Sequence, residues 1–336
     1  MILLRKILFP FAVLYGWIMQ CRNFLYDKGF LKSYSFDLPI IAVGNLSVGG
    51  TGKTPQIEYL IRLLSDNYKI ATLSRGYKRE SKGFVLADET STAAILGDEP
   101  YQFYRKFPKI QVTVDADRKN GIEQLLSLPN KPNIILLDDA FQHRKVKAGF
   151  YILLTAYDDL FCNDYILPTG NLRESRSGAN RANCIIVTKC PKVISELERD
   201  EIRKKLGSNN PVFFSSIEYD DCIYSANESK QVSEIKNLNK LLIAGIAKPK
   251  SFFDFLKNQN DTSLTFPDHH HFTASDILTI KSKAKGSLII TTEKDYVRLR
   301  NSIPNNQLFY LPIKTSFISE RTTFDSIISD YLKITI

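Results

Sequence analysis

The sequence predicts an α/β protein built around a parallel sheet with helices on its faces, and two observations support this. First, short apolar runs alternate with helical patterns along most of the chain, which is typical of strand–helix–strand crossovers. Second, some runs, such as IILL at 134–137, are apolar without interruption, as expected of strands buried on both faces. The chain has 336 residues, 43% of them hydrophobic and 24% charged, which suits about two globular domains.

The predicted elements follow in a regular order. An uncharged stretch at 7–19 comes first. Strands are predicted at 40–43, 69–73, 111–114, 134–137, 151–154 and 185–187, with helices between several of them, for example at 55–65 and 118–127. A polar segment at 219–239 indicates a boundary, after which a second α/β unit begins at 241–246 and includes 287–291. We therefore expect an N-terminal helix within 1–32, a core domain at 33–220 and a smaller α/β domain at 221–336.

Composition and charge exclude several classes of protein. No run approaches the roughly 18 to 20 apolar residues that span a bilayer, so a polytopic membrane protein is excluded. The five cysteines are scattered without a C-x-x-C pair, which predicts reduced thiols in a cytosolic compartment rather than a disulfide framework or a zinc site. The net charge of +9 suits phosphate-bearing ligands or a membrane surface. No basic stripe with interleaved aromatic residues indicates a nucleic-acid partner.

The N-terminal 32 residues have the properties of an interfacial membrane helix. The uncharged stretch at 7–19 has 13 residues and would reach about 20 Å as a helix, which is short of a hydrocarbon core of about 30 Å. Five basic residues and one acidic residue give this segment +4 of the chain's +9. Trp17, Tyr15 and Tyr26 are residue types that favour the headgroup level. The sequence predicts a helix lying in one leaflet; a helix packed on its own domain and a signal peptide or true span are the alternatives.

A phosphate-binding loop is predicted at 40–57, IIAVGNLSVGGTGKTPQI, where an apolar strand runs into a glycine-rich turn, a G-K-T triplet and a helix. Backbone N–H groups of the turn and the helix start would contact phosphates, and Lys53 and Thr54 would reach the β- and γ-phosphates and Mg²⁺, respectively. The generic pattern has Gly where this chain has Ser47. The alternative is a glycine-rich turn without a ligand. The predicted nucleotide contacts are Ser47, Val48, Gly49, Gly50, Thr51, Gly52, Lys53 and Thr54.

The acidic partner for Mg²⁺ is predicted at the end of a buried strand in NIILLDD, 133–139. Asp138 is placed to face the ion directly or through water, and Asp139 is adjacent. A helix N-cap is the alternative for such aspartates. Together with the phosphate loop, these residues predict an ATP- or GTP-dependent enzyme with a P-loop NTPase-like sheet.

Nine sequence motifs occur in order between residues 43 and 299. They are VGNLSVGGTGKTP at 43–55, LSRGYKR at 73–79, GDEP at 97–100, DDAFQHR at 138–144, LPTGNLRES at 167–175, VTK at 187–189, AGIAKPKSFF at 244–253, FPDHHHF at 266–272 and TTEKDYVRL at 291–299. Taken together, these motifs resemble one known family, the tetraacyldisaccharide 4′-kinases, which are the lipid A 4′-kinases of Gram-negative bacteria. Ser or Thr at the first loop position is usual in that family, which accounts for Ser47.

The resemblance implies a reaction and a location. ATP would give its γ-phosphoryl group to the 4′-hydroxyl of a tetraacylated glucosamine disaccharide 1-phosphate, forming the lipid A precursor lipid IVA. Two α/β/α units would hold the nucleotide between them. The chain would be a peripheral, monotopic protein at the cytoplasmic leaflet of the bacterial inner membrane, with ATP and Mg²⁺ as cofactors and without an obligate protein partner.

The resemblance also assigns a base for the acceptor alcohol. In the family, the Asp that matches Asp98 in GDEP is the catalytic base, and the His of a D-H motif works with it as a dyad. We carry that role to His269, which directly follows Asp268. Two further histidines, His270 and His271, come next, so a metal site and a solvated loop remain open as alternatives for this run.

The remaining candidates surround the phosphates and the substrate. Glu99 is a candidate Mg²⁺ ligand through water, and Gln142 could orient metal waters or substrate. Arg75, Tyr77 and Arg173 are the candidate substrate residues, because fixed cations stabilise phosphoryl groups. Each has an alternative interpretation. Glu99 could be an exposed carboxylate in a turn, Gln142 could make only local hydrogen bonds, and the arginines could be solvated or structural cations.

Two other function classes compete with a lipid kinase. A nucleotide switch or partitioning ATPase would need no base for an alcohol, and a kinase with a soluble acceptor would leave the N-terminal helix unexplained.

Overall fold

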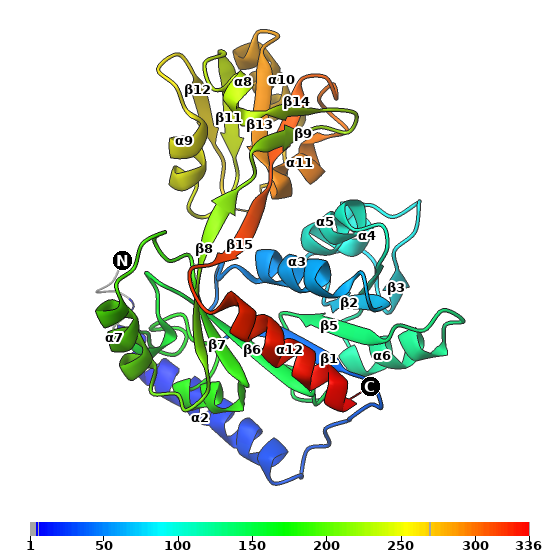
Figure 1. Cartoon of the computed structure of the whole chain (residues 1–336), viewed down its shortest axis with the longest axis vertical. Helices are drawn as coiled ribbons and strands as arrows, with labels where there is room; N and C mark the ends of the chain where they lie inside the picture. Colours follow the sequence, from blue (N-terminus) through cyan, green and yellow to red (C-terminus); the bar gives the residue numbers. More distant parts are fainter. Residues whose placement is uncertain (1–4, 6, 269, 336) are drawn as a thin grey trace.

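The computed structural model describes residues 5, 7–268 and 270–335 and places them in two α/β units, one above the other in Figure 1. Two long strands, β8 (Val212–Tyr219) and β15 (Ile313–Phe317), connect the units. They pair with each other in antiparallel register, from Ile313 opposite Tyr219 to Phe317 opposite Ser215. The two chain crossings between the units therefore form one hydrogen-bonded ribbon.

The larger unit contains a sheet of nine strands within the described residues, in the order β15-β8-β7-β6-β1-β5-β2-β4-β3. The sheet is parallel except at its two edges, where β3 and β15 are antiparallel to their neighbours. The predicted strands of this unit are all present, with ends within two residues of the expected ones. Their bounds are β1 Ile40–Asn45, β2 Ile70–Ser74, β3 Val85–Leu86, β4 Gln111–Val114, β5 Ile134–Asp138, β6 Phe150–Ala156 and β7 Cys184–Thr188.

Helices cover both faces of this sheet because its central strands are apolar on both sides. In β1, Ile41 and Val43 pack in one core cluster with α3, whereas Ile40 and Ala42 pack in another with α6. The alternation follows from the two-residue period of a strand. The helices of this unit are α3 Lys53–Leu64, α4 Ala93–Leu96, α5 Asp98–Lys106, α6 Arg118–Ser127 and α7 Glu196–Leu206, with short 3₁₀ turns at Phe161–Asn163 and Arg176–Arg181.

An N-terminal helix, α2 (Phe9–Asp27), lies along the outer edge of the larger unit (Figure 1). Its inward residues are small: Ala12 and Gly16 are buried, and a Cβ atom at Gly16 would come within 3.0 Å of Ile166. Most of its large apolar residues face outward, with Phe11 63% and Trp17 65% exposed. No helix in the described part of the chain combines the length and hydropathy needed to cross a bilayer.

The smaller unit contains a six-stranded sheet within the described residues, in the order β10-β9-β14-β13-β11-β12. The predicted strands at 241–246 and 287–291 correspond to β11 and β13, which form its parallel centre. The polar segment at 219–239 carries regular structure, namely β9, β10 and α8. The bounds are β9 Cys222–Tyr224, β10 Ser229–Gln231, α8 Val232–Ile235, β11 Lys240–Ala244, α9 Lys250–Leu256, β12 Thr262–Thr265, α10 Ala274–Ala284, β13 Leu288–Thr292, α11 Glu293–Leu299 and β14 Leu308–Leu311.

The C-terminal segment returns to the larger unit, which differs from the expectation that 221–336 forms one domain. After β15, helix α12 (Arg321–Thr335) buries Phe324, Ile328 and Leu332 in the same core cluster as Ile57 and Ile61 of α3. The apolar spacing of 324–332 predicts a helix with one buried face, but it carries no information on which sheet that face covers.

A buried ionic cluster joins the two units beside the connecting strands. The Lys106 ammonium group lies 2.7 Å from Glu58 of α3 and 2.6 Å from Glu293 of α11. Glu293 also accepts a hydrogen bond from the backbone N–H of Ile313, at the start of β15. Burial, reinforced by the charge of Glu58, raises the pKa of Glu293 to about 7. Lys106 therefore compensates a carboxylate that is otherwise poorly solvated.

Replacing Lys106 by Met should lower the free energy of unfolding by about 3–5 kcal/mol at pH 8, because Glu293 then remains buried without its cation. Burial raises the pKa of Glu293 to about 7 even though Lys106 lowers it, so without Lys106 the pKa of Glu293 in the folded variant lies higher still. Protonation of Glu293 at pH 6 removes the unpaired charge, and the loss should shrink there. Urea unfolding at the two pH values measures both effects. The matched control is Lys109→Met, which removes an exposed lysine and should leave the free energy of unfolding unchanged. An equal loss of stability in Lys106→Met at both pH values would contradict the proposed role of Lys106.

Candidate active site

The phosphate loop has the backbone geometry that the sequence predicts. Helix α3 begins at Lys53, immediately after Gly52. Gly49 and Gly52 have φ angles of +117° and +87°, a region that side chains with a Cβ atom rarely adopt. The buried hydroxyl oxygen of Thr51 has no hydrogen-bond partner in the described part of the chain. A buried polar atom without a partner, at a helix N-terminus, suits an incoming phosphate oxygen.

Two neighbouring segments hold the loop in place. The backbone N–H of Val48 donates to Asn171 O at 2.8 Å, and that of Arg173 donates to Leu46 O at 2.8 Å, so residues 171–173 pair with the loop. On the other side, the Thr188 hydroxyl donates to Thr51 O at 2.7 Å, and Lys189 donates to the carbonyl of Gly50. The stretches LPTGNLRES and VTK thus support the loop, a role that the sequence left open.

The two aspartates after β5 differ in environment. Asp138 ends the strand and is buried; burial raises its pKa to about 7, and the nearby Glu99 and Asp139 carboxylates add to the rise. Asp139 lies in a turn, not at a helix N-cap. Burial opposes its ionisation, but the charges of Lys53 and Arg173 outweigh it and keep the pKa of Asp139 below its usual range. Lys53 Nζ lies 3.6 Å from Asp139 Oδ1, and Arg173 donates to both carboxylate oxygens at 3.0 and 3.1 Å.

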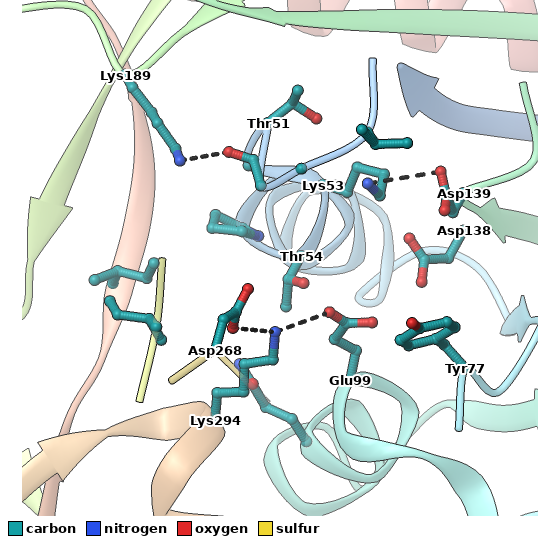
Figure 2. Close-up of a pocket in the computed structure, with 18 of the residues that line it drawn as sticks. Thr51, Lys53, Thr54, Tyr77, Glu99, Asp138, Asp139, Lys189, Asp268 and Lys294 are labelled. Carbon is teal, nitrogen blue, oxygen red and sulfur yellow. Dashed lines mark hydrogen bonds and ion pairs between the residues drawn. The ribbon is translucent and has the colours of Figure 1, made fainter. Parts of the chain in front are cut away.

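A large cavity opens in front of the loop, between the two units. Its volume is about 1450 Å³. Most of the predicted site residues line it, and so do residues of the smaller unit, among them Asp268 and Lys294. Figure 2 shows the Lys294 ammonium group between the carboxylates of Asp268 and Glu99, at 3.6 and 3.7 Å. The predicted residues in the wall are Val48, Gly49, Gly50, Thr51, Gly52, Lys53, Thr54, Arg75, Tyr77, Glu99, Asp138, Asp139, Gln142 and Arg173; Ser47 is buried beside them.

The N-terminal helix contributes to the same cavity, which the sequence did not indicate. Tyr15, Met19 and Arg22 lie in the cavity wall. The Tyr15 hydroxyl donates to Arg173 O at 3.0 Å, and Arg22 donates to Gln142 O at 3.1 Å. One side of α2 thus contacts the site while its other side presents exposed apolar residues.

Gln142 is occupied by protein contacts. Its amide nitrogen donates to Asn45 O at 2.8 Å and to Glu174 at 3.1 Å, and its amide oxygen accepts from Arg173 at 3.4 Å. These bonds connect β1 to Arg173, so Gln142 orients the residues around the loop.

A neutral histidine follows Gln142 in the cavity wall. Burial, with help from the positive charge of Arg118, lowers the pKa of His143 to about 4. Its Nε2 atom is buried and finds no hydrogen-bond partner among the described residues. The side chain is therefore a neutral donor or acceptor at physiological pH.

The first two residues of helix α5, Asp98 and Glu99, have different surroundings. Glu99 contributes to the cavity wall. Asp98 is the first residue of the helix, and its carboxylate accepts hydrogen bonds from both Nε and Nη2 of Arg298 on α11, with Nε to Oδ1 at 3.2 Å.

The histidine run has one described member with a clear structural role. His269, the expected partner of Asp98, lies outside the described residues. His270 Nε2 lies 3.0 Å from Asp276 Oδ2, and its ring stacks on Phe266. These contacts tie His270 to the start of α10.

Several site residues carried no clear signal in the sequence. Ser74 donates to Asp138 Oδ2 at 3.2 Å, and the buried Arg118 donates to Asp138 O at 3.3 Å. Ser74 belongs to the stretch LSRGYKR, where the cations drew attention first. Arg118 opens a predicted helix that follows β4. The parallel pairing of β2 with β5 and with β4 brings both residues to the aspartates.

Comparison with known proteins agrees with this site. Residues 4–333 match the family model described as tetraacyldisaccharide-1-P 4'-kinase. The chain is 67% identical over 334 residues to the tetraacyldisaccharide 4'-kinase of Flavobacterium psychrophilum, covering 98% of this chain and 97% of the relative. It is 46% identical over 357 residues to that of Bacteroides thetaiotaomicron, with 98% and 94% covered. The crystal structure of LpxK from Aquifex aeolicus in complex with ATP matches at 32% identity with a TM-score of 0.80, covering 98% of this chain and 99% of that one. The chain belongs to the tetraacyldisaccharide-1-P 4'-kinase family.

Proposed function

We propose that this protein transfers the γ-phosphoryl group of ATP to the 4′-hydroxyl of a tetraacylated glucosamine disaccharide 1-phosphate, which makes the lipid A precursor lipid IVA. The relatives carry this activity in their names. The observation that carries the proposal is the cavity itself, which connects the phosphate loop to the exposed helix α2. A kinase for a membrane-embedded sugar needs both features within one site.

ATP is the proposed donor, bound by the loop residues 47–54. The glycine-rich turn lets backbone N–H groups approach the phosphates. Lys53 lies at the first turn of α3 and would contact the transferred group. The related structure from Aquifex aeolicus contains ATP, which favours ATP over GTP.

The residues beside the loop fit a magnesium ion. The carboxylate of Glu99 lies close enough to Asp138 to raise the pKa of Asp138. A bound cation would relieve this repulsion between the two carboxylates. The described residues contain no group of three His, Cys, Asp or Glu side chains that could hold a metal; Mg²⁺ usually takes one or two carboxylates, waters and substrate phosphates. We assign Thr54 and Asp138 as the ligands, with Asp139, Glu99 and Gln142 around them. The ion would neutralise charge between the phosphate oxygens.

The substrate headgroup is proposed to lie between Arg75, Tyr77 and Arg173. Arg75 and Tyr77 line the cavity from the loop after β2. Because Arg173 already pairs with Asp139, it connects the metal side of the site to the sugar side. Guanidinium groups bind phosphate oxygens in pairs, which suits the 1-phosphate of the disaccharide.

Asp98, together with His269, is proposed to accept the proton of the 4′-hydroxyl. An alcohol is a weak nucleophile at neutral pH, and a positioned base accelerates its attack. Asp98 stands at the start of α5, one residue before Glu99 in the cavity wall. A base at the start of α5 would remove the proton of the 4′-hydroxyl as its oxygen attacks the γ-phosphate held by the loop.

The enzyme is proposed to work at the cytoplasmic leaflet of the inner membrane as a peripheral protein. The acyl chains would remain in the bilayer below α2 while the sugar enters the cavity beside Tyr15 and Arg22. A transfer assay tests the function directly: γ-labelled ATP, Mg²⁺ and a detergent-dispersed acylated disaccharide 1-phosphate should yield labelled lipid. Hydrolysis of ATP without labelled lipid would instead favour a nucleotide switch.

Replacing three outward residues of the N-terminal segment, Phe11, Trp17 and Phe30, by Ser should release the protein from anionic vesicles. Each is more than half exposed, and each large side chain contributes about 1.5 kcal/mol or more when fully buried. The vesicle partition coefficient should therefore fall at least tenfold, as flotation measures. These changes leave the inward contacts of α2 intact, which deletion of 1–28 would not.

The matched control for this experiment replaces Val193 and Leu197 by Ser. These residues are 88% and 80% exposed, but Val193 lies just before α7 and Leu197 in its first turn. Flotation should be unaffected in the control. Unchanged flotation of the triple variant contradicts the membrane role of α2.

A further inference from the structure

Helix α11, in the smaller unit, carries charged side chains that the proposed reaction has not yet used. The helix directly follows strand β13, and its residues Lys294 and Arg298 point to the start of α5 in the larger unit. Lys294 pairs with Glu99 and with Asp268. Arg298 pairs with Asp98. Two cations on one helix therefore hold the two consecutive carboxylates that open α5.

The contact between Arg298 and Asp98 has the geometry of a fork. Nε and Nη2 of the guanidinium group each donate to a different oxygen of the carboxylate. The side chain of Arg298 is 9% exposed and that of Asp98 is 21% exposed, so water screens the pair weakly. A bidentate bond of this kind fixes both the position and the plane of a carboxylate.

Arg298 is itself anchored in the smaller unit. Its Nη1 atom lies 3.6 Å from Asp295 Oδ1 and donates to His270 O at 3.4 Å. Asp295 is buried and accepts hydrogen bonds from the backbone N–H of Gly245 at 2.7 Å and from the Thr292 hydroxyl at 2.7 Å. The guanidinium group is thus held by the sheet of the smaller unit and by the loop that follows FPD.

We propose that Arg298 is a positioning residue for the acceptor base: it orients the Asp98 carboxylate and ties that orientation to the smaller unit. The inference rests on the proposed role of Asp98. When the two units are seated as in this structure, the carboxylate has one allowed plane. When they separate, the fork and the orientation that it imposes on the carboxylate are lost. Acceptor activation is therefore coupled to the seating of the smaller unit against α5.

A second arginine, directly after the same helix, offers a matched control. Arg300 follows the last residue of α11 and also reaches α5, where its Nη1 donates to the Tyr101 hydroxyl at 3.4 Å. It contacts no residue of the proposed machinery among those described. Loss of Arg300 weakens the same contact between units without altering Asp98. The two arginines therefore separate a positioning effect from simple loss of the interface.

The test compares Arg298→Gln, Arg298→Lys and Arg300→Gln in the lipid phosphorylation assay, with unfolding temperature measured for each. Arg298→Gln should lower kcat on the order of 100-fold, since small misplacement of a catalytic group has effects of that size, while KM for ATP stays within about twofold. Arg298→Lys keeps the charge but not the fork and should recover part of the loss. Arg300→Gln should keep the kcat of the unmodified enzyme.

Measuring Asp98→Asn alone and combined with Arg298→Gln completes a double-mutant cycle. The double variant should be no slower than Asp98→Asn, because Arg298 acts through Asp98. If Asp98→Asn is inactive while folded Arg298→Gln turns over normally, the positioning inference is wrong and the proposed base stands. If Asp98→Asn itself turns over normally, the assignment of the base is wrong, and the inference falls with it. Equal losses of kcat in Arg298→Gln and Arg300→Gln also overturn the inference.

Discussion

Asp98→Asn should reduce lipid phosphorylation by about 10²- to 10⁴-fold, the range that a positioned general base contributes. Asparagine has nearly the shape of aspartate, but it cannot accept the proton of the 4′-hydroxyl. Asp98 lies on α5 beside Glu99 of the cavity wall, and its surroundings include Arg298 and the loop that carries His270. The loss should appear in kcat, while the affinity for ATP, measured by calorimetry, should change little, because the phosphate loop belongs to another element.

The neighbouring histidines provide the control for this prediction. His269→Ala should lower turnover by a similar factor if it forms the dyad with Asp98. His270→Ala should act mainly on stability, because His270 is bound to Asp276 and stacked on Phe266. Equal effects on kcat from both variants mean that the dyad has been placed on the wrong residue. Normal turnover by Asp98→Asn leaves the reaction without its proposed base.

The sequence predicts the core of the fold well because the signals there are local. Uninterrupted apolar runs identified the central strands, and the glycine-rich turn between β1 and α3 could be read from spacing alone. Residues 313–335 could not be placed in this way. Strand β15 and helix α12 have ordinary patterns, and their position depends on pairing with β8 and on packing against α3, which are contacts between residues more than 90 positions apart.

In the candidate site, too, the sequence predicts the residues that belong to local motifs but not their distant partners. Lys53 and Thr54 are predicted from the glycine-rich loop and Asp138 from the end of a strand, and all three line one cavity. The partners of these residues are not local. Arg298 meets Asp98 across 200 positions of sequence, and Tyr15 of α2 reaches Arg173 across 158. Such pairs depend on how two units and a helix are seated on one another, which no short motif encodes.

Lys53→Met should lower the rate of phosphoryl transfer by about 10²- to 10³-fold, the usual effect of removing one group that stabilises charge in the transition state. Lys53 Nζ lies 3.5 Å from Asn45 Oδ1 and 3.6 Å from Asp139 Oδ1, so the ammonium group is already held over the loop. The variant should stay folded, since Arg173 still pairs with Asp139. Circular dichroism and the transfer assay measure the two properties separately.

Two control variants separate the charge of Lys53 from its position. Lys53→Arg keeps a cation near Asp139, but its longer planar head does not fit the place of an ammonium group in the loop, so it should also be slow. Lys109→Met removes an exposed lysine and should leave transfer unchanged. If Lys53→Met retains a rate within tenfold of the unmodified enzyme, the phosphate loop does not hold the reacting group. If Lys53→Arg is fully active, the site needs a charge near Asp139 rather than a lysine aimed at a phosphate. Only slow transfer in both Lys53 variants, with normal folding, agrees with a loop that grips the terminal phosphates during transfer.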